Sequence, residues 1–569
     1  MNPIHSTRWM TLALILSASS MVNATVFNHN SVDATTTLAS QLTPKHKIID
    51  NGGSGPYKAE AREESSMPDV VVYKPADMNA TVKAVGKLPV LIFANGGCND
   101  TSLPHERMLN EIASHGYLVV ALGSMQERID DRKLEKSSNH QMTDIMDWLK
   151  VQSKKKGDYK ARVDLDKIAV GGQSCGGAMA LDVAKDARVK TCIMVNSGMG
   201  DIQMAGASRE SLKALHSPIL YMEGGESDIA YANGVKDYER INHVFAAFAN
   251  HLTAGHVGDF AEPYGGSFAR MIIKWLDWQF RGDQEAGKVF LEGQLEGFPE
   301  WTMKSKDLSK NQVFEPFEII EQHVKNNKGQ DIWGQIYKPK AEAGKKVPFI
   351  IMAHGYNSSS REVEAYAQTL AMNGIGSYVF DFCGGSVNSR SEGKTTEMSV
   401  FTEADDIAAI VKAAQSWNFV DADRLALLGC SQGGLVAAIA SSQMPEAFKC
   451  VILVYPALMI AEHAVHVHPK EAINSQDGVD VMGMKLSHVY YDQLVGYKVF
   501  EEMKKYTRPV MIVYGDKDPI AAGDYMQRAK ETYRSCEVNV IPNGAHGFPA
   551  YETHVLANQA IVSFLLRKL

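Results

Sequence analysis

The sequence GQSCGG at residues 172–177 decides the fold, and GCSQGG at residues 429–434 repeats its pattern. Each is a G-x-S-x-G-G run that follows a short apolar segment typical of a strand, at residues 168–170 and 425–428. A serine at a sharp strand-to-helix turn presents its hydroxyl to a substrate, while nearby backbone N–H groups face the developing oxyanion. The flanking glycines are needed because such a turn is strained and packs closely on its neighbours. We therefore predict two serine-hydrolase sites in one polypeptide.

Length and composition bound the alternatives. At 569 residues the chain is too long for a single core. An apolar content of 45% and a charged content of 22% are ordinary for a globular protein. The formal net charge of −8 gives no indication of a nucleic-acid partner or of an anionic membrane surface.

The N-terminus has the pattern of a targeting segment. A short polar start is followed by an apolar run at residues 9–22 and by small residues up to position 24. The run is short for a membrane span, so we predict a cleavable signal peptide over residues 1–24. An uncleaved anchor is the alternative. The prediction implies a secreted or periplasmic protein with no membrane span after signal cleavage.

An internal repeat organises the rest of the chain. KLPVLIFANG at residues 87–96 matches KVPFIIMAHG at 346–355, and VDLDKIAV at 163–170 matches VDADRLAL at 420–427. Continuous apolar runs of this length are typical of strands buried on both faces of a parallel sheet. Amphipathic segments at residues 141–152 and 404–417 predict helices between the strands. The fold class is therefore α/β, with two tandem domains that each have a mostly parallel sheet covered by helices on both faces.

The domain boundaries follow from this repeat. We predict an N-terminal domain over residues 45–292 and a C-terminal domain over residues 313–569. The charged stretch at residues 304–310 favours a surface linker over residues 293–312.

A serine hydroxyl needs a histidine to take its proton and a carboxylate to orient that histidine. In a doubly wound hydrolase the acid and then the histidine follow the serine, and both halves of the chain supply them. In both halves the interval from acid to histidine is 28 residues. The predicted catalytic residues are Ser174, Asp228 and His256 in the first domain and Ser431, Asp518 and His546 in the second. The fallback candidates are Glu226, His251 and Asp516.

Backbone N–H groups complete the predicted sites. One donor of each oxyanion hole is the residue after the serine, Cys175 or Gln432. The other lies in the loop after the strand that ends near position 96 or 355, and is Gly97 or Tyr356. No metal and no cofactor are needed for this chemistry.

The C-terminal half resembles bacterial cinnamoyl/feruloyl esterases. The matching residues are AHGY at 353–356, FDF at 380–382, SQGG at 431–434, Asp518 and GAHGF at 544–548. The resemblance implies an α/β-hydrolase with a cap inserted before the acid, here about residues 456–506. The serine-to-acid interval is accordingly longer here (431 to 518) than in the first half (174 to 228). Tyr490 and Tyr491 of this insert are candidates for binding an aromatic acyl group. One departure is Cys430, where the family has histidine.

The N-terminal half resembles a chlorophyllase/dienelactone-hydrolase-like group of esterases. The matching residues are GPYKA at 55–59, NGGC at 95–98, EIASHGY at 111–117, GQSCGG at 172–177 and WLDW at 275–278. The resemblance implies the fold and the triad but no particular substrate.

Cysteines lie beside both predicted nucleophiles, and their pairing is left open. Seven cysteines remain after signal cleavage, so at least one is free. A Cys98–Cys175 disulfide or a Cys383–Cys430 disulfide would brace one site, and buried free thiols are the alternative.

Together these patterns predict a secreted bifunctional serine carboxylesterase acting through acyl-enzyme intermediates. The expected partners are ester-decorated polysaccharide or oligosaccharide, or small aromatic or aliphatic esters, with feruloyl or cinnamoyl groups for the second domain and acetyl or another small acyl group for the first. The alternatives are a general lipase or polyester hydrolase, a peptidase of related fold, and one catalytic domain joined to a non-catalytic binding domain. The oligomeric state is not indicated.

Overall fold

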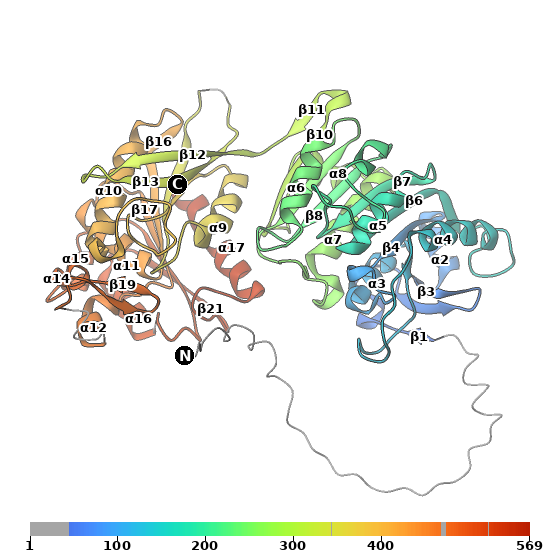
Figure 1. Cartoon of the computed structure of the whole chain (residues 1–569), viewed down its shortest axis with the longest axis horizontal. Coiled ribbons are helices and arrows are strands. Elements are labelled where there is room, and N and C mark those ends of the chain that lie inside the picture. The colour runs from blue at the N-terminus through green and yellow to red at the C-terminus, as the bar shows by residue number, and fades with distance from the viewer. Residues whose placement is uncertain (1–44, 343, 468–473, 522) are drawn as a thin grey trace, which may run out of the picture. The chain divides into compact units, whose positions relative to one another are not determined.

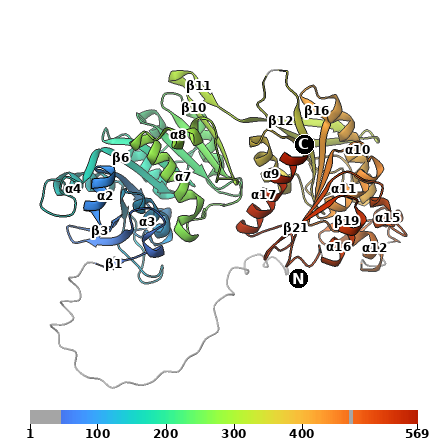
Figure 2. The same cartoon turned by 180° about the vertical axis from the view of Figure 1, so that it is seen from behind.

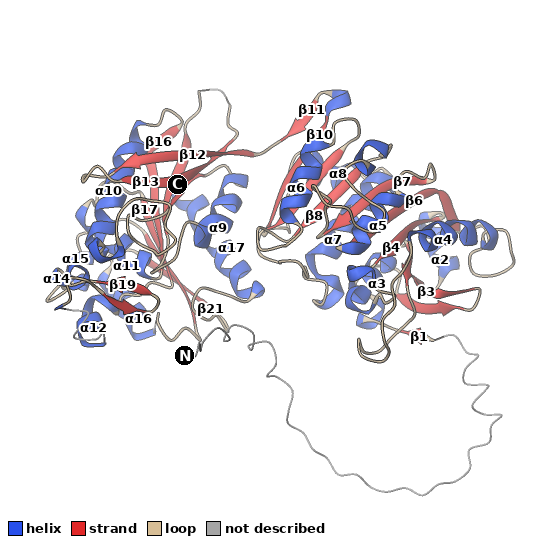
Figure 3. Ribbon diagram, viewed as in Figure 1, coloured by secondary structure: helices blue, strands red, loops and turns tan. Residues whose placement is uncertain are grey.

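A computed structural model of the chain describes residues 45–342, 344–467, 474–521 and 523–569. The predicted signal peptide at residues 1–24 lies outside them. Within these ranges, no helix is long and apolar enough to cross a membrane. They form two large mixed sheets with helices packed around them, and a small two-stranded sheet (Figures 1 and 3).

The first domain is built on a sheet that has 11 strands among the described residues, in the order β1-β2-β3-β5-β4-β6-β7-β8-β9-β10-β11. The six strands from β5 to β9 in that order run parallel, whereas β3 and β10 pair antiparallel at either end of the parallel part. The strands are β1 (His46–Lys47), β2 (Ala59–Glu64), β3 (Met67–Pro75), β4 (Leu88–Ala94), β5 (Leu118–Leu122), β6 (Val163–Gln173), β7 (Val189–Val195), β8 (Ile219–Glu223), β9 (Ala246–His251), β10 (Trp301–Asp307) and β11 (Gln312–Phe314). The α-helices are α2 (Met78–Val85), α3 (Glu106–Ser114), α4 (Asn139–Gln152), α5 (Cys175–Val183), α6 (Tyr231–Arg240), α7 (Gly266–Leu276) and α8 (Gln284–Leu291).

Helices cover both faces of this sheet because its central strands are apolar on both sides. In β4, Val90 and Ile92 belong to one buried cluster, whereas Leu91 and Phe93 belong to another. Side chains of α2, α4, α5 and α6 complete the first cluster, and those of α3, α7 and α8 complete the second. Successive side chains of a strand point to opposite faces of the sheet, so apolar strands need helices on both faces. The domain therefore has three layers, with the sheet between two layers of helices.

The main sheet of the second domain has eight strands among the described residues, in the order β12-β13-β15-β14-β16-β17-β20-β21. From β15 to β21 the strands run parallel, and β13 pairs antiparallel with β15. In Figures 1 and 2, α9 and α17 lie on one side of the sheet and α10 and α11 on the other. The strands are β12 (Phe317–Lys325), β13 (Asp331–Pro339), β14 (Val347–Ala353), β15 (Gly376–Phe380), β16 (Val420–Cys430), β17 (Cys450–Val454), β20 (Val510–Gly515) and β21 (Cys536–Ile541). The helices around it are α9 (Arg361–Met372), α10 (Val400–Ser416), α11 (Gln432–Gln443), α16 (Gly523–Thr532) and α17 (Tyr551–Lys568).

The sequence repeat is a repeat of the sheet. Strand β4 pairs with β6 in the same register as β14 with β16, and each pair has a register shift near its start. Ala94 lies opposite Gly172, and Ala353 lies opposite Gly429. The predicted fold class, two tandem α/β domains with mostly parallel sheets, is confirmed.

The structure corrects the predicted linker at residues 293–312. Trp301–Asp307 is strand β10, which pairs antiparallel with β9, and β11 extends the sheet further. The side chains of Trp301 and Met303 are buried, while Lys304 and Lys306 lie over the Tyr238 ring at 4.8 and 4.7 Å from its centre. The lysines made the segment resemble a solvated linker, but their charges rest on an aromatic face.

The second domain carries an insertion between β17 and β20, where the cap was predicted. It contains α12 (Ile460–Val467), β18 (Val479–Val481), β19 (Met484–Leu486), α14 (Val489–Asp492) and α15 (Val499–Met503). Strands β18 and β19 form a small antiparallel sheet of their own. The first domain has only a short 3₁₀ turn, Ser211–Ala214, between the corresponding strands β7 and β8.

Candidate active sites

Both predicted nucleophiles lie at a strained turn between a strand and a helix. Ser174 separates β6 from α5 with φ 53° and ψ −120°, and Ser431 separates β16 from α11 with φ 52° and ψ −117°. These left-handed angles are unfavourable for a residue with a side chain. The glycines allow the turn: a Cβ on Gly172 would lie 2.3 Å from the Gly176 backbone, and one on Gly429 would lie 2.0 Å from the Gly433 oxygen.

In the first domain the structure brings the three predicted residues together. His256 Nε2 lies 2.9 Å from Ser174 Oγ, and His256 Nδ1 lies 2.7 Å from Asp228 Oδ1. Asp228 is buried and also accepts hydrogen bonds from the Ala230 and Gly224 N–H groups and from Asn196 Nδ2. Burial alone would raise the pKa of Asp228, but these hydrogen bonds outweigh burial and lower the pKa to about 2. The acid is therefore held as a carboxylate that orients the histidine.

The second domain has the same arrangement. His546 Nε2 lies 2.9 Å from Ser431 Oγ, and His546 Nδ1 lies 2.8 Å from Asp518 Oδ2. The other oxygen of Asp518 accepts hydrogen bonds from the N–H groups of Ile520 and Ala521 at 2.8 and 2.9 Å. Burial opposes ionisation, but the bonds from His546 and these N–H groups lower the pKa of Asp518 below its ordinary value.

The two histidine side chains are almost equally exposed. The exposed fraction is 26% for His256 and 23% for His546. The described part of the cap therefore leaves the second site accessible to a substrate.

The fallback residues take no part in the described hydrogen bonds of the two triads. Glu226 and Asp516 are exposed. His251 is fully buried, and its Nδ1 accepts the N–H groups of Thr253 and Ala254 at 3.2 and 3.1 Å. The His251 imidazole therefore supports the loop before His256.

The predicted oxyanion donors lie beside the nucleophiles. Cys175 and Gln432 are the first residues of α5 and α11. Gly97 lies in the 3₁₀ turn Gly96–Cys98 after β4, with φ 62°. In the second domain a Cβ on Gly355, the residue before Tyr356, would lie 3.0 Å from Ser431 Cβ. The loop after β14 thus approaches Ser431. The roles of the N–H groups in both loops stay a prediction.

A disulfide joins Cys98 to Cys175, which settles one of the open pairings. Cys383 and Cys430 are buried free thiols. The first site is therefore braced by a disulfide, whereas the second is not.

One of the two cap tyrosines contacts the residue that follows the second nucleophile. Tyr490 is buried, and its hydroxyl donates to Gln432 Oε1 at 2.7 Å. Gln432 Nε2 in turn donates to Glu403 Oε2 at 2.9 Å. Tyr491 is also buried and packs edge-on against the Tyr490 ring, with 5.1 Å between ring centres. The cap is thus hydrogen-bonded to the residue that follows the nucleophile.

Sequence reasoning missed two residues that support the triads. Asn196 donates to Asp228 Oδ2 at 2.6 Å. At the equivalent place in the second domain, the Tyr455 ring packs edge-on against the His546 ring at 4.9 Å between centres. Both follow the strand after the nucleophile helix, but the two residues differ in type, so aligning the two repeats gives no signal for either.

Sequence models of two protein families match the two halves. The model of the chlorophyllase family matches residues 52–214, and the model of the prolyl oligopeptidase family matches residues 361–569. The chain is a tandem α/β-hydrolase. The first match includes Ser174 of the tandem hydrolase, and the second includes its whole predicted Ser431 triad.

Individual relatives of this tandem hydrolase were also found. The hydrolase phmG of Phaeosphaeria nodorum is 32% identical over 115 residues, which are 20% of this chain and 25% of that protein. The chain therefore matches about a quarter of the length of this curated relative. Among solved structures, Est1E of Butyrivibrio proteoclasticus with bound ferulic acid has a TM-score of 0.39 at 26% identity, covering 43% of this chain and 98% of that one. A second Est1E structure has a TM-score of 0.38 at 24% identity, covering 44% and 98%.

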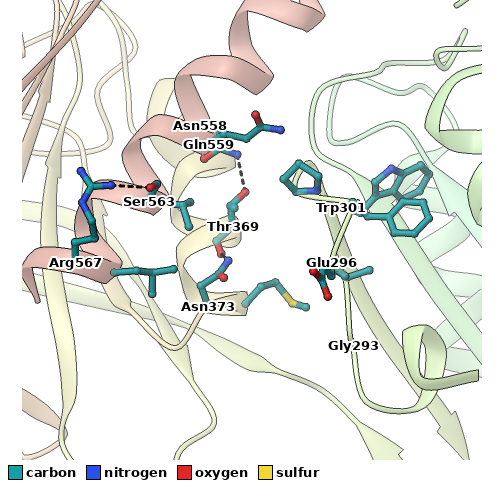
Figure 4. A pocket seen from close by; sticks show the side chains of 16 residues that line it. Gly293, Glu296, Trp301, Thr369, Asn373, Asn558, Gln559, Ser563 and Arg567 are labelled. Carbon is teal, nitrogen blue, oxygen red and sulfur yellow. Dashed lines mark hydrogen bonds between the residues drawn. The ribbon is translucent and has the colours of Figure 1, made fainter. Parts of the chain in front are cut away.

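The structure also has a pocket that lies apart from both triads. Figure 4 shows Asn558 on α17 donating to Thr369 Oγ1 on α9 at 2.9 Å, and Arg567 donating to Ser563 Oγ at 2.8 Å. None of the six triad residues lines this pocket.

Proposed function

We propose that the chain is a serine carboxylesterase with two independent sites, centred on Ser174 and Ser431. The observation that carries the proposal is that each serine hydroxyl lies 2.9 Å from a histidine nitrogen. The other nitrogen of each histidine lies within 2.8 Å of a buried aspartate. This is the arrangement that makes a serine hydroxyl nucleophilic at neutral pH.

The proposed reaction follows from these contacts. Histidine Nε2 takes the serine proton as Oγ attacks the ester carbonyl, and the N–H groups beside the serine stabilise the oxyanion. The histidine then gives its proton to the leaving alcohol, which leaves an acyl-serine. A water molecule, deprotonated by the same histidine, attacks the acyl-serine and releases the acid.

For the second domain we propose feruloyl or cinnamoyl esters as substrates. The cap supplies two adjacent tyrosine rings, Tyr490 and Tyr491, and Tyr490 contacts the residue after Ser431. Both side chains are buried, so their proposed role is to form the packed wall behind an aromatic acyl group close to the nucleophile.

For the first domain we propose acetyl or another small acyl group as the substrate. Both activities on one exported chain would suit the removal of two ester decorations from one plant polysaccharide, since tethering raises the effective concentration of the second site. A general lipase or polyester hydrolase would use the same catalytic groups and is the broader alternative.

A second candidate function for the C-terminal domain is peptide hydrolysis, because the prolyl oligopeptidase family model matches residues 361–569. Amide and ester hydrolysis share the acyl-enzyme mechanism. Rates on prolyl peptide amides and on methyl ferulate, measured with one preparation, separate the two functions.

The deciding experiment compares the parent chain with Ser174→Ala, Ser431→Ala and the double variant. Methyl ferulate, 4-nitrophenyl acetate and a long-chain 4-nitrophenyl ester are the substrates. We expect Ser431→Ala to remove feruloyl hydrolysis, Ser174→Ala to remove a different part of the panel, and the double variant to be inactive. Activity of the double variant would refute the proposal. If both single variants lost the same single activity, the two sites would not be independent. If the serine variant of one domain lost no activity, that domain would be assigned as a non-catalytic binding domain.

A further inference from the structure

The disulfide of the first domain joins the two segments that carry its proposed oxyanion donors. Cys175 is the first residue of α5 and directly follows Ser174. Its partner Cys98 directly follows Gly97, in the turn after β4. The bond therefore connects one donor residue to the immediate neighbour of the other, across 77 residues of sequence.

The loop that carries Gly97 has an unfavourable backbone conformation. Gly97 has φ 62° and Cys98 has φ 52°. Two successive residues are thus in the left-handed region, and the second has a side chain. Such a conformation persists only where its surroundings hold it.

The side-chain and backbone hydrogen bonds that tie this loop to the segment before α4 lead away from helix α5. Lys136 Nζ donates to Gly97 O at 2.5 Å, and the Ser137 N–H donates to Cys98 O at 2.8 Å. Lys136 and Ser137 precede α4. The disulfide is the covalent link between the loop and the helix that carries the other donor.

The second site holds the equivalent loop with hydrogen bonds instead. Tyr356 Oη donates to Val481 O of the cap at 2.7 Å, and the Gly355 N–H donates to Glu362 Oε2 at 2.7 Å. The cysteine beside its nucleophile, Cys430, is a buried free thiol. The loop of the first site is therefore held by a disulfide as well as by hydrogen bonds, whereas no disulfide holds the loop of the second site.

We propose that the Cys98–Cys175 disulfide positions the two oxyanion donors of the first site, so that hydrolysis at Ser174 requires oxidised cysteines whereas hydrolysis at Ser431 does not. The inference rests on the proposed function. The triad hydrogen bonds of Ser174 and His256 involve neither cysteine, so they persist after reduction. Loss of the bond should weaken transition-state stabilisation, and so lower kcat more than it changes KM.

The reductant is a dithiol such as dithiothreitol. It supplies two electrons: the S–S bond breaks, each sulfur takes a proton to become a thiol, and the dithiol is released as a cyclic disulfide. Cys175 is half-buried, and we expect a small thiolate to reach the bond from its side.

The experiment uses Ser431→Ala to report the first site and Ser174→Ala to report the second. Both proteins are assayed before and after dithiothreitol, and thiols are counted in denaturant. We expect the count to rise from five to seven. The kcat of Ser431→Ala should fall at least tenfold with KM within about threefold, and that of Ser174→Ala should stay within twofold. An unchanged kcat in Ser431→Ala with seven thiols would overturn the proposal.

The affinity of a trifluoromethyl ketone inhibitor tests whether the disulfide positions the oxyanion donors or only stabilises the fold. The ketone adds to the serine as a hemiketal whose oxyanion needs the same donors. Its affinity for the first site should fall by the same factor as kcat on reduction. If Ser174→Ala removes no ester hydrolysis, the proposed function fails at that site, and the ketone affinity still tests the positioning role.

Cysteine variants provide an independent test. In the Ser431→Ala background, Cys98→Ser combined with Cys175→Ser should reproduce the reduced kcat and no longer respond to dithiothreitol. The matched control is Cys536→Ser, which removes a half-buried free thiol and should behave as its parent. Full kcat in the double-cysteine variant would overturn the proposal, and if that variant does not fold, the reduction experiment decides.

Discussion

Asn196 and Tyr455 occupy the same position in the two domains, but they act on different members of the triads. Each follows the strand beside the nucleophile, and each donates its N–H to the next parallel strand, at Met222 O or Val513 O. Both have a positive φ, of 44° and 36°. Asn196 hydrogen-bonds the acid Asp228, whereas the Tyr455 ring packs against the base. The repeated scaffold therefore supports its two triads by hydrogen bonding in one case and by packing in the other.

Asn196→Ala should impair the first site alone. The variant removes the 2.6 Å hydrogen bond to Asp228, and a hydrogen bond to a charged group contributes about 1.5–3 kcal/mol. We expect kcat/KM at Ser174 to fall about tenfold, since about 1.4 kcal/mol corresponds to one decade. The measurement is ester hydrolysis in the Ser431→Ala background. Asn196→Ala in the Ser174→Ala background reports the second site and is the control, and an equal loss at both sites would contradict the prediction.

Tyr490→Phe should impair the second site alone. It removes the hydrogen bond from the cap to Gln432 Oε1, a neutral bond that contributes about 0.5–1.5 kcal/mol. We expect a several-fold lower kcat at Ser431, because the residue that carries a proposed oxyanion donor loses its support. Tyr497→Phe is the matched control, since that ring packs on Phe401 at the periphery of the cap. A larger effect of the control on kcat would argue against the role of Tyr490.

Glu403→Gln should stabilise the second domain at neutral pH but not at pH 4. Burial raises the pKa of Glu403 well above its ordinary value, so the folded state favours the protonated acid. Below the unfolded pKa of about 4.3 both states are protonated and the side chain costs nothing. Above it the unfolded state ionises, and stability falls by up to about 1.4 kcal/mol for each pH unit. Glutamine cannot ionise, so thermal unfolding should show no gain at pH 4 and a gain at pH 7 and 8, above the unfolded pKa. A variant less stable than the parent at pH 8 would show that the carboxylate form is required.

The sequence predicted the features that have local signatures. We predicted the fold class from the G-x-S-x-G-G runs and the apolar strands. The equal acid-to-histidine intervals added the remaining triad residues, and the structure brings all six side chains into hydrogen-bonding distance within their sites. Asn196 was missed because one polar residue after an apolar strand has no spacing pattern, and its contact with Asp228 exists only once β7 and β8 pair. Likewise the bond from Tyr490 to Gln432 joins residues 58 positions apart, and only the folded cap brings them into contact.

The strand order of the first sheet predicts which C-terminal end an isolated N-terminal domain needs in order to fold. Strand β10 covers the edge of β9, and Trp301, which is 1% exposed, donates its indole N–H to Ser267 Oγ at 2.9 Å. A fragment of residues 45–292 exposes the β9 edge and loses this ring, so we expect aggregation. A fragment of residues 45–315 should fold and retain Ser174 activity. Within the full chain, Trp301→Ala should cost about 3–5 kcal/mol, whereas Leu308→Ala, at a 46% exposed position, should cost little. Equal melting temperatures for the two fragments would show that residues 293–312 are a linker after all.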